Sequence, residues 1–290
     1  MVSQLLLKKK YQKTAYAKIN FFLHVLSKRA DSFHEVESLI GFTEFGDKVF
    51  VEESDFLEFV FEGPMSNDLP RLEENIVFEA VNLLKKEYKI SSGARIKIEK
   101  NIPIAAGLGG GSSDAAAVVD CLTKLWGLKI SKEILGQKLL SLGADFPVCL
   151  NGETAFVKGK GEICFPVSST FSYPILLVNP RKQLKTQEVF SKVDLSNCYK
   201  KSINKDEICI DDIKKYTNDL FSSAIVLVPQ IKEIIKLLSS LNGCIFANLS
   251  GSGPTCFGIF DSLEKFNAAS RTISRNFDWW VMPTFIKGKR

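Results

Sequence analysis

The chain has 290 residues, too many for one small hydrophobic core and enough for one large domain or two of ordinary size. Hydrophobic residues make up 45% and charged residues 24%, a composition that excludes a disordered chain. The formal net charge of +5 favours anionic small molecules, but it is too weak and too scattered to indicate nucleic acid binding.

Cysteines and termini indicate the compartment. The seven cysteines are odd in number and none forms a C-x-x-C pair, which argues against a zinc site or a disulfide framework and favours a reducing cytoplasm. The opening MVSQLLLKKKYQK does not resemble a secretory signal, and we expect residues 1–12 to form a loosely ordered extension. No apolar run approaches the 18 or more residues of a membrane span.

The first half of the chain predicts strands and one helix before a glycine-rich loop. Residues 16–25 alternate as a strand, with Lys18 and Asn20 on the face opposite the apolar one, about 7 Å apart by strand rise. The next expected elements are two strands within 46–63 joined by a turn near 53–55, a helix over 75–88 and a strand over 94–100.

The loop itself reads PIAAGLGGGSSDAAA and leads into a helix. Apolar spacings of four and three residues predict a helix over 113–126, with Gly127 as its cap. A second helix is expected over 132–145, followed by a turn-rich strand region over 146–162.

The second half continues without a clear linker. The expected order is a strand (173–180), an unassigned polar stretch (187–222), a helix (229–243), two strands (244–260) around the glycine-rich loop 250–254, a helix (262–276) and a strand (279–286). This order after residue 166 suits an α+β sandwich of ferredoxin-like type.

A strand, a glycine-rich turn and a helix N-terminus together form an anion site. Gly107, Gly109, Gly110 and Gly111 let backbone N–H groups approach an oxyanion, and the helix dipole adds positive potential. Three interpretations compete: a purely structural turn, a dinucleotide fold and a nucleoside triphosphate loop. Ser112 stands where a dinucleotide fingerprint needs its third glycine, and no G-K-[ST] of the Walker type follows.

The same loop closely resembles the P-x-x-x-G-L-G-S-S-x-A-A phosphate loop of the GHMP kinases. Three other stretches agree in order: AYAKINFFLHVLSKRADSFHEVESL (15–39), LGADFPVCLNGETAFVKGKGE (142–162) and LSGSGPTCFGIF (249–260). NDL at 218–220 and ENIVFEA at 74–80 also fit, so the resemblance covers about residues 14–286. Four separated motifs in order are far more specific than one glycine loop.

The resemblance implies a two-lobed α+β fold. Its N-terminal, ATP-binding domain (1–166) would be like ribosomal protein S5 domain 2, and its C-terminal domain (167–290) ferredoxin-like. The implied activity is transfer of the ATP γ-phosphate to a hydroxyl of a cytidine-diphosphate-linked methylerythritol, with Mg²⁺ accompanying ATP. We expect a monomer or weak homodimer. A kinase for mevalonate, homoserine or a sugar is the nearest alternative, although RADSFH (29–34) speaks against it; a non-catalytic nucleotide-binding regulator is another, and a nicotinamide oxidoreductase the weakest.

Two residues are candidates for catalysis. Asp145 in GADFP could accept the proton of the acceptor hydroxyl; its spacing alone equally allows a helix-end cap, and the resemblance favours the base. Lys18, on an otherwise aromatic and amide-bearing strand face, could pair with Asp145 and touch the transferred phosphate or the acceptor oxygen.

The remaining site residues are implied by the resemblance. For the acceptor they are Asn20, the cytosine-binding His34, the stacking Phe33 and Thr186. The family has glycine and tyrosine at 32 and 33 where this chain has Ser32 and Phe33, so stacking survives and a phenolic hydrogen bond does not. For ATP they are Pro103, Ile104, Ala105, Ala106, Gly107, Leu108, Gly109, Gly110, Gly111, Ser112, Ser113, Lys100 and Asn75. The 250–254 loop is expected to buttress the phosphate loop or approach the acceptor, and could equally serve only a tight hairpin. His24 is expected to be structural.

Overall fold

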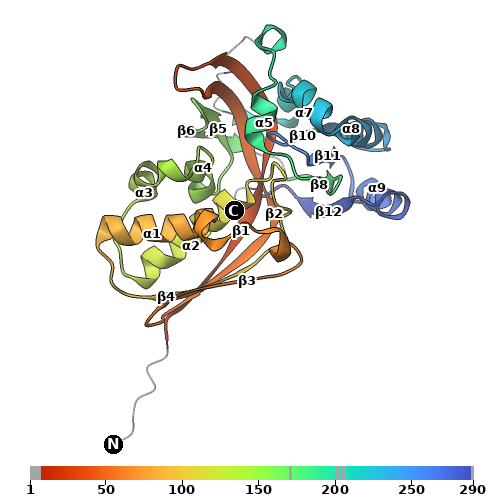
Figure 1. The fold of residues 1–290 in the computed structure, drawn as a ribbon. Coiled ribbons are helices and arrows are strands. Elements are labelled where there is room, and N and C mark those ends of the chain that lie inside the picture. The colour runs from red at the N-terminus through yellow and green to blue at the C-terminus, as the bar shows by residue number, and fades with distance from the viewer. Residues whose placement is uncertain (1–7, 170–171, 200–202, 204–206, 289–290) are drawn as a thin grey trace, which may run out of the picture.

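A computed structural model describes residues 8–169, 172–199, 203 and 207–288 (Figure 1). In the N-terminal lobe a curved antiparallel hairpin of two long strands runs the height of the molecule (Figure 1). The strands of this lobe are β1 (Lys10–Lys28), β2 (His34–Glu52), β3 (Leu57–Glu62), β4 (Ala94–Glu99), β5 (Ala155–Lys158) and β6 (Ile163–Pro166). Their order is β3-β4-β2-β5-β6, with β1 paired to β2.

The helices of the N-terminal lobe form a layer, and the one that follows the glycine-rich loop packs against the β1–β2 hairpin. They are α1 (Ile76–Tyr88), α2 (Gly110–Leu125), α3 (Lys132–Lys138) and α4 (Phe146–Asn151). α2 contacts both β1 and β2, and its buried small residues Ala115, Ala116 and Ala117 let its axis come close to the sheet. α1 and α4 flank α2, so the helix that follows the glycine-rich loop is central in this layer.

The C-terminal lobe is the expected ferredoxin-like sandwich. Its sheet of β8 (Pro174–Asn179), β10 (Cys244–Leu249), β11 (Cys256–Phe260) and β12 (Trp280–Phe285) has the order β10-β11-β8-β12. Its helices are α5 (Thr186–Phe190), α6 (Ile210–Ile213), α7 (Phe221–Leu227), α8 (Gln230–Ser240) and α9 (Leu263–Asn276). The short strands β7 (Ser168–Ser169) and β9 (Glu207–Ile208) pair in parallel. Short 3-10 helices occur in both lobes, at Ser66–Asp68, Leu72–Glu74 and Leu140–Leu142 in the N-terminal lobe and at Leu195–Asn197 in the C-terminal lobe.

One apolar cluster joins the two lobes. Ala17, Ile19 and Phe21 of β1 are fully buried and belong to the same cluster as Ile175 of β8 and Phe257 of β11. The rings of Phe21 and Phe257 meet edge to face at 6.2 Å between centroids. The sequence shows no linker because the lobes share this core.

The structure corrects three local predictions. The helix expected over 132–145 breaks after Lys138, and residues 146–151 of the expected strand region form α4, which Pro147 favours near its start. β1 begins at Lys10, so the end of the expected N-terminal extension is strand, while residues 1–7 lie outside the described residues. The two strands expected within 46–63 correspond to the end of β2 and to β3, and β3 pairs in parallel with β4.

Candidate active site

The glycine-rich loop links β4 to α2 and closes against the C-terminal lobe. Gly107 and Gly109 have φ values of +75° and +64°, a region that favours glycine, and α2 begins at Gly110, three residues earlier than predicted. A Cβ at Gly107 would lie 2.3 Å from the carbonyl oxygen of Ser250, and one at Gly109 would lie 2.5 Å from Cγ of Lys18. Both positions therefore need glycine for space as well as for conformation.

Lys18, Asn20 and Asp145 meet beside this loop. The ammonium of Lys18 donates to Oδ1 of Asn20 at 2.5 Å and lies 3.3 Å from Oδ2 of Asp145. Asn20 is held in turn by its donation to the hydroxyl of Ser38 at 2.8 Å. Lys18 is 5% exposed, whereas the carboxylate side chain of Asp145 is 36% exposed and open to a ligand.

Asp145 occupies the residue before α4 without capping that helix. Its side chain accepts no hydrogen bond from the first turn, and its carbonyl accepts from the N–H of Cys149 at 3.1 Å. The carboxylate is instead directed to Lys18. Of the two roles that spacing left open, the geometry favours a chemical one over a cap.

The second glycine-rich loop, residues 250–254, contacts the phosphate loop and the Lys18–Asn20 strand. The hydroxyl of Ser250 donates to the carbonyl of Gly107 at 3.0 Å and accepts from the backbone N–H of Asn20 at 3.3 Å. A Cβ at Gly251 would lie 3.1 Å from Oδ1 of Asn20. The loop thus does more than close a hairpin.

Aromatic side chains gather where β2 begins. Phe33 is 55% exposed, and the ammonium of Lys160 lies 4.9 Å from its ring centroid. The ring of His34 stacks on Phe190 at 5.1 Å, and partial burial, with a contribution from Lys28, lowers the pKa of His34.

Helix α5 connects these rings to the 250–254 loop. It begins at Thr186 and ends at Phe190, and the hydroxyl of Thr186 lies 3.0 Å from that of Ser252. Thr186 is therefore placed between the aromatic group and the second glycine-rich loop.

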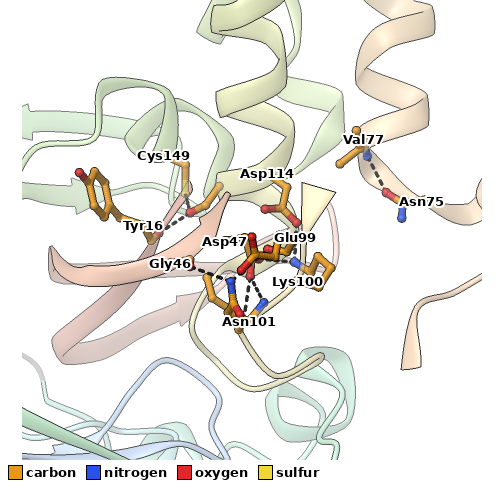
Figure 2. Close-up of polar contacts among 12 residues, drawn as sticks. Tyr16, Gly46, Asp47, Asn75, Val77, Glu99, Lys100, Asn101, Asp114 and Cys149 are labelled. Carbon is orange, nitrogen blue, oxygen red and sulfur yellow. Dashed lines mark hydrogen bonds and ion pairs between the residues drawn. The ribbon is translucent and has the colours of Figure 1, made fainter. Parts of the chain in front are cut away.

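Three residues expected at the nucleotide have protein partners in the structure (Figure 2). The ammonium of Lys100 is buried between Asp47 and Asp114, which departs from the expected nucleotide contact. Asn75 caps α1 by accepting from the N–H of Val77 at 2.9 Å. The hydroxyl of Ser113 donates to the carbonyl of Tyr16 at 2.8 Å, which leaves the half-buried Ser112 as the more accessible serine of the loop.

His24 belongs to a packed aromatic group. Its ring stacks on Tyr199 at 4.1 Å and lies 4.8 Å from Phe22, and it is fully buried. Burial lowers its pKa, an effect that Asp219 and Glu37 oppose. This arrangement fits the expected structural role.

Metal ligands do not cluster within the part of the chain that the structure describes. There, no group of three or more histidine, cysteine or acidic side chains could hold an ion. The residues fit a Mg²⁺ ion only as a companion of ATP, held mainly by phosphates and water.

Several residues of the site escaped prediction. Ser38, Phe190, Lys160 and Asp47 are brought to it by strand pairing and by α5 packing, contacts between residues distant in sequence. Only Ser38 carried a sequence signal, as a polar residue in the apolar stretch of β2.

Comparison with known proteins identifies the family. The model described as GHMP kinases N terminal domain matches residues 75–153, and that described as GHMP kinases C terminal matches residues 205–278. Among solved structures, a homoserine kinase from Cytophaga hutchinsonii shares the fold, with a TM-score of 0.68 and 17% identity over 99% of this chain and 97% of that one.

Curated relatives are similar along nearly their whole length. The 4-diphosphocytidyl-2-C-methyl-D-erythritol kinase of Parvibaculum lavamentivorans is 37% identical over 92% of this chain and 95% of its own, and that of Wolbachia pipientis is 40% identical over 93% and 96%. The crystal structure of a 4-(cytidine 5'-diphospho)-2C-methyl-D-erythritol kinase superposes with a TM-score of 0.78 and 28% identity over 96% of this chain and all of that one. With both family domains matched and relatives aligned over almost the entire chain, this protein belongs to the GHMP kinases.

Proposed function

We propose that the chain transfers the γ-phosphate of ATP to the 2-hydroxyl of 4-diphosphocytidyl-2-C-methyl-D-erythritol, giving the 2-phosphate and ADP, in the methylerythritol phosphate route to isopentenyl diphosphate. The observation that carries this proposal is the group formed by Lys18, Asn20 and Asp145 against Gly109 of the phosphate loop. The names of the relatives supply the acceptor.

ATP binding is assigned to residues 103–113. Their backbone N–H groups and the N-terminus of α2 offer donors and positive potential to the triphosphate, and the small side chains leave room for it. Asn75 is assigned to the nucleotide because the next residue, Ile76, contacts the loop: its Cγ2 lies 3.1 Å from the position of a Cβ at Gly111. Mg²⁺ would enter with ATP and would neutralise phosphate charge.

Asp145 and Lys18 divide the chemical work. The partly exposed carboxylate of Asp145 accepts the proton of the acceptor hydroxyl as the oxygen attacks the γ-phosphorus. Lys18, whose ammonium is fixed by Asp145 and Asn20, stabilises the negative charge of the phosphoryl group during its transfer. No covalent enzyme intermediate is needed, because alignment and charge compensation supply the rate.

The acceptor's cytosine is assigned to the aromatic group at the start of β2. Phe33 offers an exposed ring for stacking, and His34, held against Phe190, offers hydrogen-bonding nitrogens. Asn20, which accepts from Lys18, and Thr186, which lies beside Ser252, are assigned to further contacts with the acceptor. Phenylalanine at 33 removes a phenolic hydrogen bond but keeps the stacking surface.

Further parts of the proposal concern organisation. We place the domain boundary at 166/167, after β6 and before β8, which is the first strand of the C-terminal sheet along the chain. The cysteine pattern of the sequence supports a reducing, cytoplasmic setting. The state of assembly stays a prediction, a monomer or weak homodimer. Within the described residues, no helix is both long enough and apolar enough to cross a membrane.

The test is coupled ADP release with purified protein, ATP, Mg²⁺ and the CDP-linked alcohol. The proposal predicts ADP formation that depends on this acceptor, with mevalonate, homoserine and a sugar run in parallel. ADP release no higher than the ATPase background would refute it. Higher turnover with one of the other alcohols would refute the proposed acceptor and support a kinase with a different substrate.

A further inference from the structure

A buried charge triad lies beneath the phosphate loop. The ammonium of Lys100, one residue past the end of β4, contacts the carboxylates of Asp47 on β2 and Asp114 on α2 (Figure 2). The three side chains are between 0% and 3% exposed, and the Lys100–Asp114 contact is 2.5 Å. Nothing in the proposed chemistry uses these groups, yet burying three charges together is costly.

The triad ties both ends of the loop to one strand. Oδ1 of Asp47 accepts the backbone N–H groups of Asn101 and Ile102, at 2.5 and 2.8 Å, where the loop leaves β4. Oδ2 of Asp47 holds Lys100, which in turn holds Asp114 near the start of the helix that the loop enters. Asp47 therefore holds the start of the loop directly and the start of α2, where the loop ends, through Lys100.

The charge count of the triad matters for an anionic ligand. Two carboxylates and one ammonium would leave a net negative charge under a triphosphate site. Burial raises the pKa of Asp114 well above its usual range; Lys100 opposes this shift, and the neighbouring carboxylate of Asp47 adds to it. Both carboxylates contact the single ammonium of Lys100, and Oδ1 of Asp114 is buried with no hydrogen-bond partner among the described residues. A second full negative charge at Asp114 would therefore be buried without compensation, which favours the protonated acid there.

We propose that Asp47, Lys100 and Asp114 form a positioning device that fixes the two ends of the phosphate loop relative to each other for binding of the triphosphate, with Asp114 as the neutral acid so that the triad carries no net charge. Because the three side chains are buried and contact one another, we assign them no contact with ATP. They act through the backbone of Asn101 and Ile102 and through α2. The proposal rests on ATP being the donor, as proposed above.

Two substitutions of one residue test the device, because the Lys100–Asp47 ion pair survives both. Asp114→Asn keeps the size, the neutral charge and the hydrogen bonds, so the KM for ATP is expected to stay within about threefold of the wild type. Asp114→Ala cuts the tie to α2, so the KM for ATP is expected to rise about tenfold or more at an unchanged KM for the acceptor. A merely structural role would lower the melting temperature and move both constants together.

The outcomes separate clearly. A folded Asp114→Ala with wild-type KM for ATP overturns the device, and an Asp114→Asn that unfolds or loses ATP as the alanine variant does overturns the neutral acid. If Asp114→Ala does not fold, the double variant Lys100→Met/Asp114→Asn replaces it, and wild-type ATP affinity there overturns the device. If the double variant also unfolds, Asp114→Asn alone decides. A KM for ATP more than threefold above that of the wild type then overturns the proposal, and a KM within threefold supports it. ATP affinity is measured by calorimetry in addition to turnover. A wild-type protein that binds ATP but does not phosphorylate the CDP-linked alcohol would refute the proposed acceptor, and the triad could still be tested through ATP affinity.

Discussion

Replacing Asp145 by asparagine tests the chemical centre of the proposal. The change keeps the size of the side chain and removes its capacity to accept a proton. General bases contribute roughly 10²–10⁴ to rate, so kcat is expected to fall by that factor, which corresponds to about 2.7–5.5 kcal/mol in the activation barrier. The fold should tolerate the change, because asparagine keeps an oxygen that can accept from the ammonium of Lys18, which Oδ1 of Asn20 also accepts.

ATP binding separates this role from a general loss of the site. Removing a negative charge near the phosphates should leave ATP affinity unchanged or slightly higher, as measured by calorimetry. Asp211→Asn is the matched control, since Asp211 lies in an exposed pair with Lys214 on α6 in the C-terminal lobe, and it should behave as wild type. Turnover of Asp145→Asn within about threefold of the wild type would refute the assignment of Asp145 as the base.

Three further predictions use strain, space and protonation. Ser32 has φ +69°, so Ser32→Gly should raise the free energy of unfolding by about 0.5–1 kcal/mol in urea titration; a decrease would contradict the strain. Gly109→Ala should displace Lys18 and reduce kcat about tenfold or more, whereas Gly127→Ala, with φ +68° and no atom within 4 Å, should strain the backbone and keep activity. His24 has a folded pKa below its ordinary value of 6.5, so the unfolded chain binds the proton more tightly and stability falls as pH drops below 6.5. His24→Phe should lose this fall, as measured by unfolding at about pH 5.5 and about pH 7.5, and an unchanged difference would contradict it.

The periodic segments of the sequence predicted most of the fold. The alternation of residues 16–25 and the helical spacing over 75–88 correspond to β1 and α1, and the order of elements after residue 166 corresponds to the ferredoxin-like sheet. These patterns are local, since each element buries one face and displays the other. Helix α2 was predicted too short because glycines at its start suggested loop, whereas Gly109 in the left-handed region completes the turn and Gly110 is already helical.

Contacts between distant residues set the limit of prediction. The family resemblance implied a nucleotide contact for Lys100, and only the fold shows that its ammonium contacts Asp47, 53 residues earlier in the chain. Phe190 lies in a stretch without periodicity, and its place beside His34 depends on how α5 packs. Contacts between side chains remote in sequence leave no periodic pattern. The pairing of these strands and the packing of the short helices therefore become known only from the structure.

The irregular pairing of β1 explains how one strand serves both the core and the site. Its register against β2 shifts between Tyr16 and Lys18 and again between Asn20 and Phe22, so the segment Lys18–Asn20 is bounded by two irregularities. Such bulges re-aim side chains and increase local twist. Between them, Ile19 enters the core shared by the lobes while Lys18 and Asn20 turn to Asp145 and the second glycine-rich loop. A shift of one residue would bury an ammonium in that core, so the packing of the lobes and the direction of the proposed catalytic lysine are fixed by the same register.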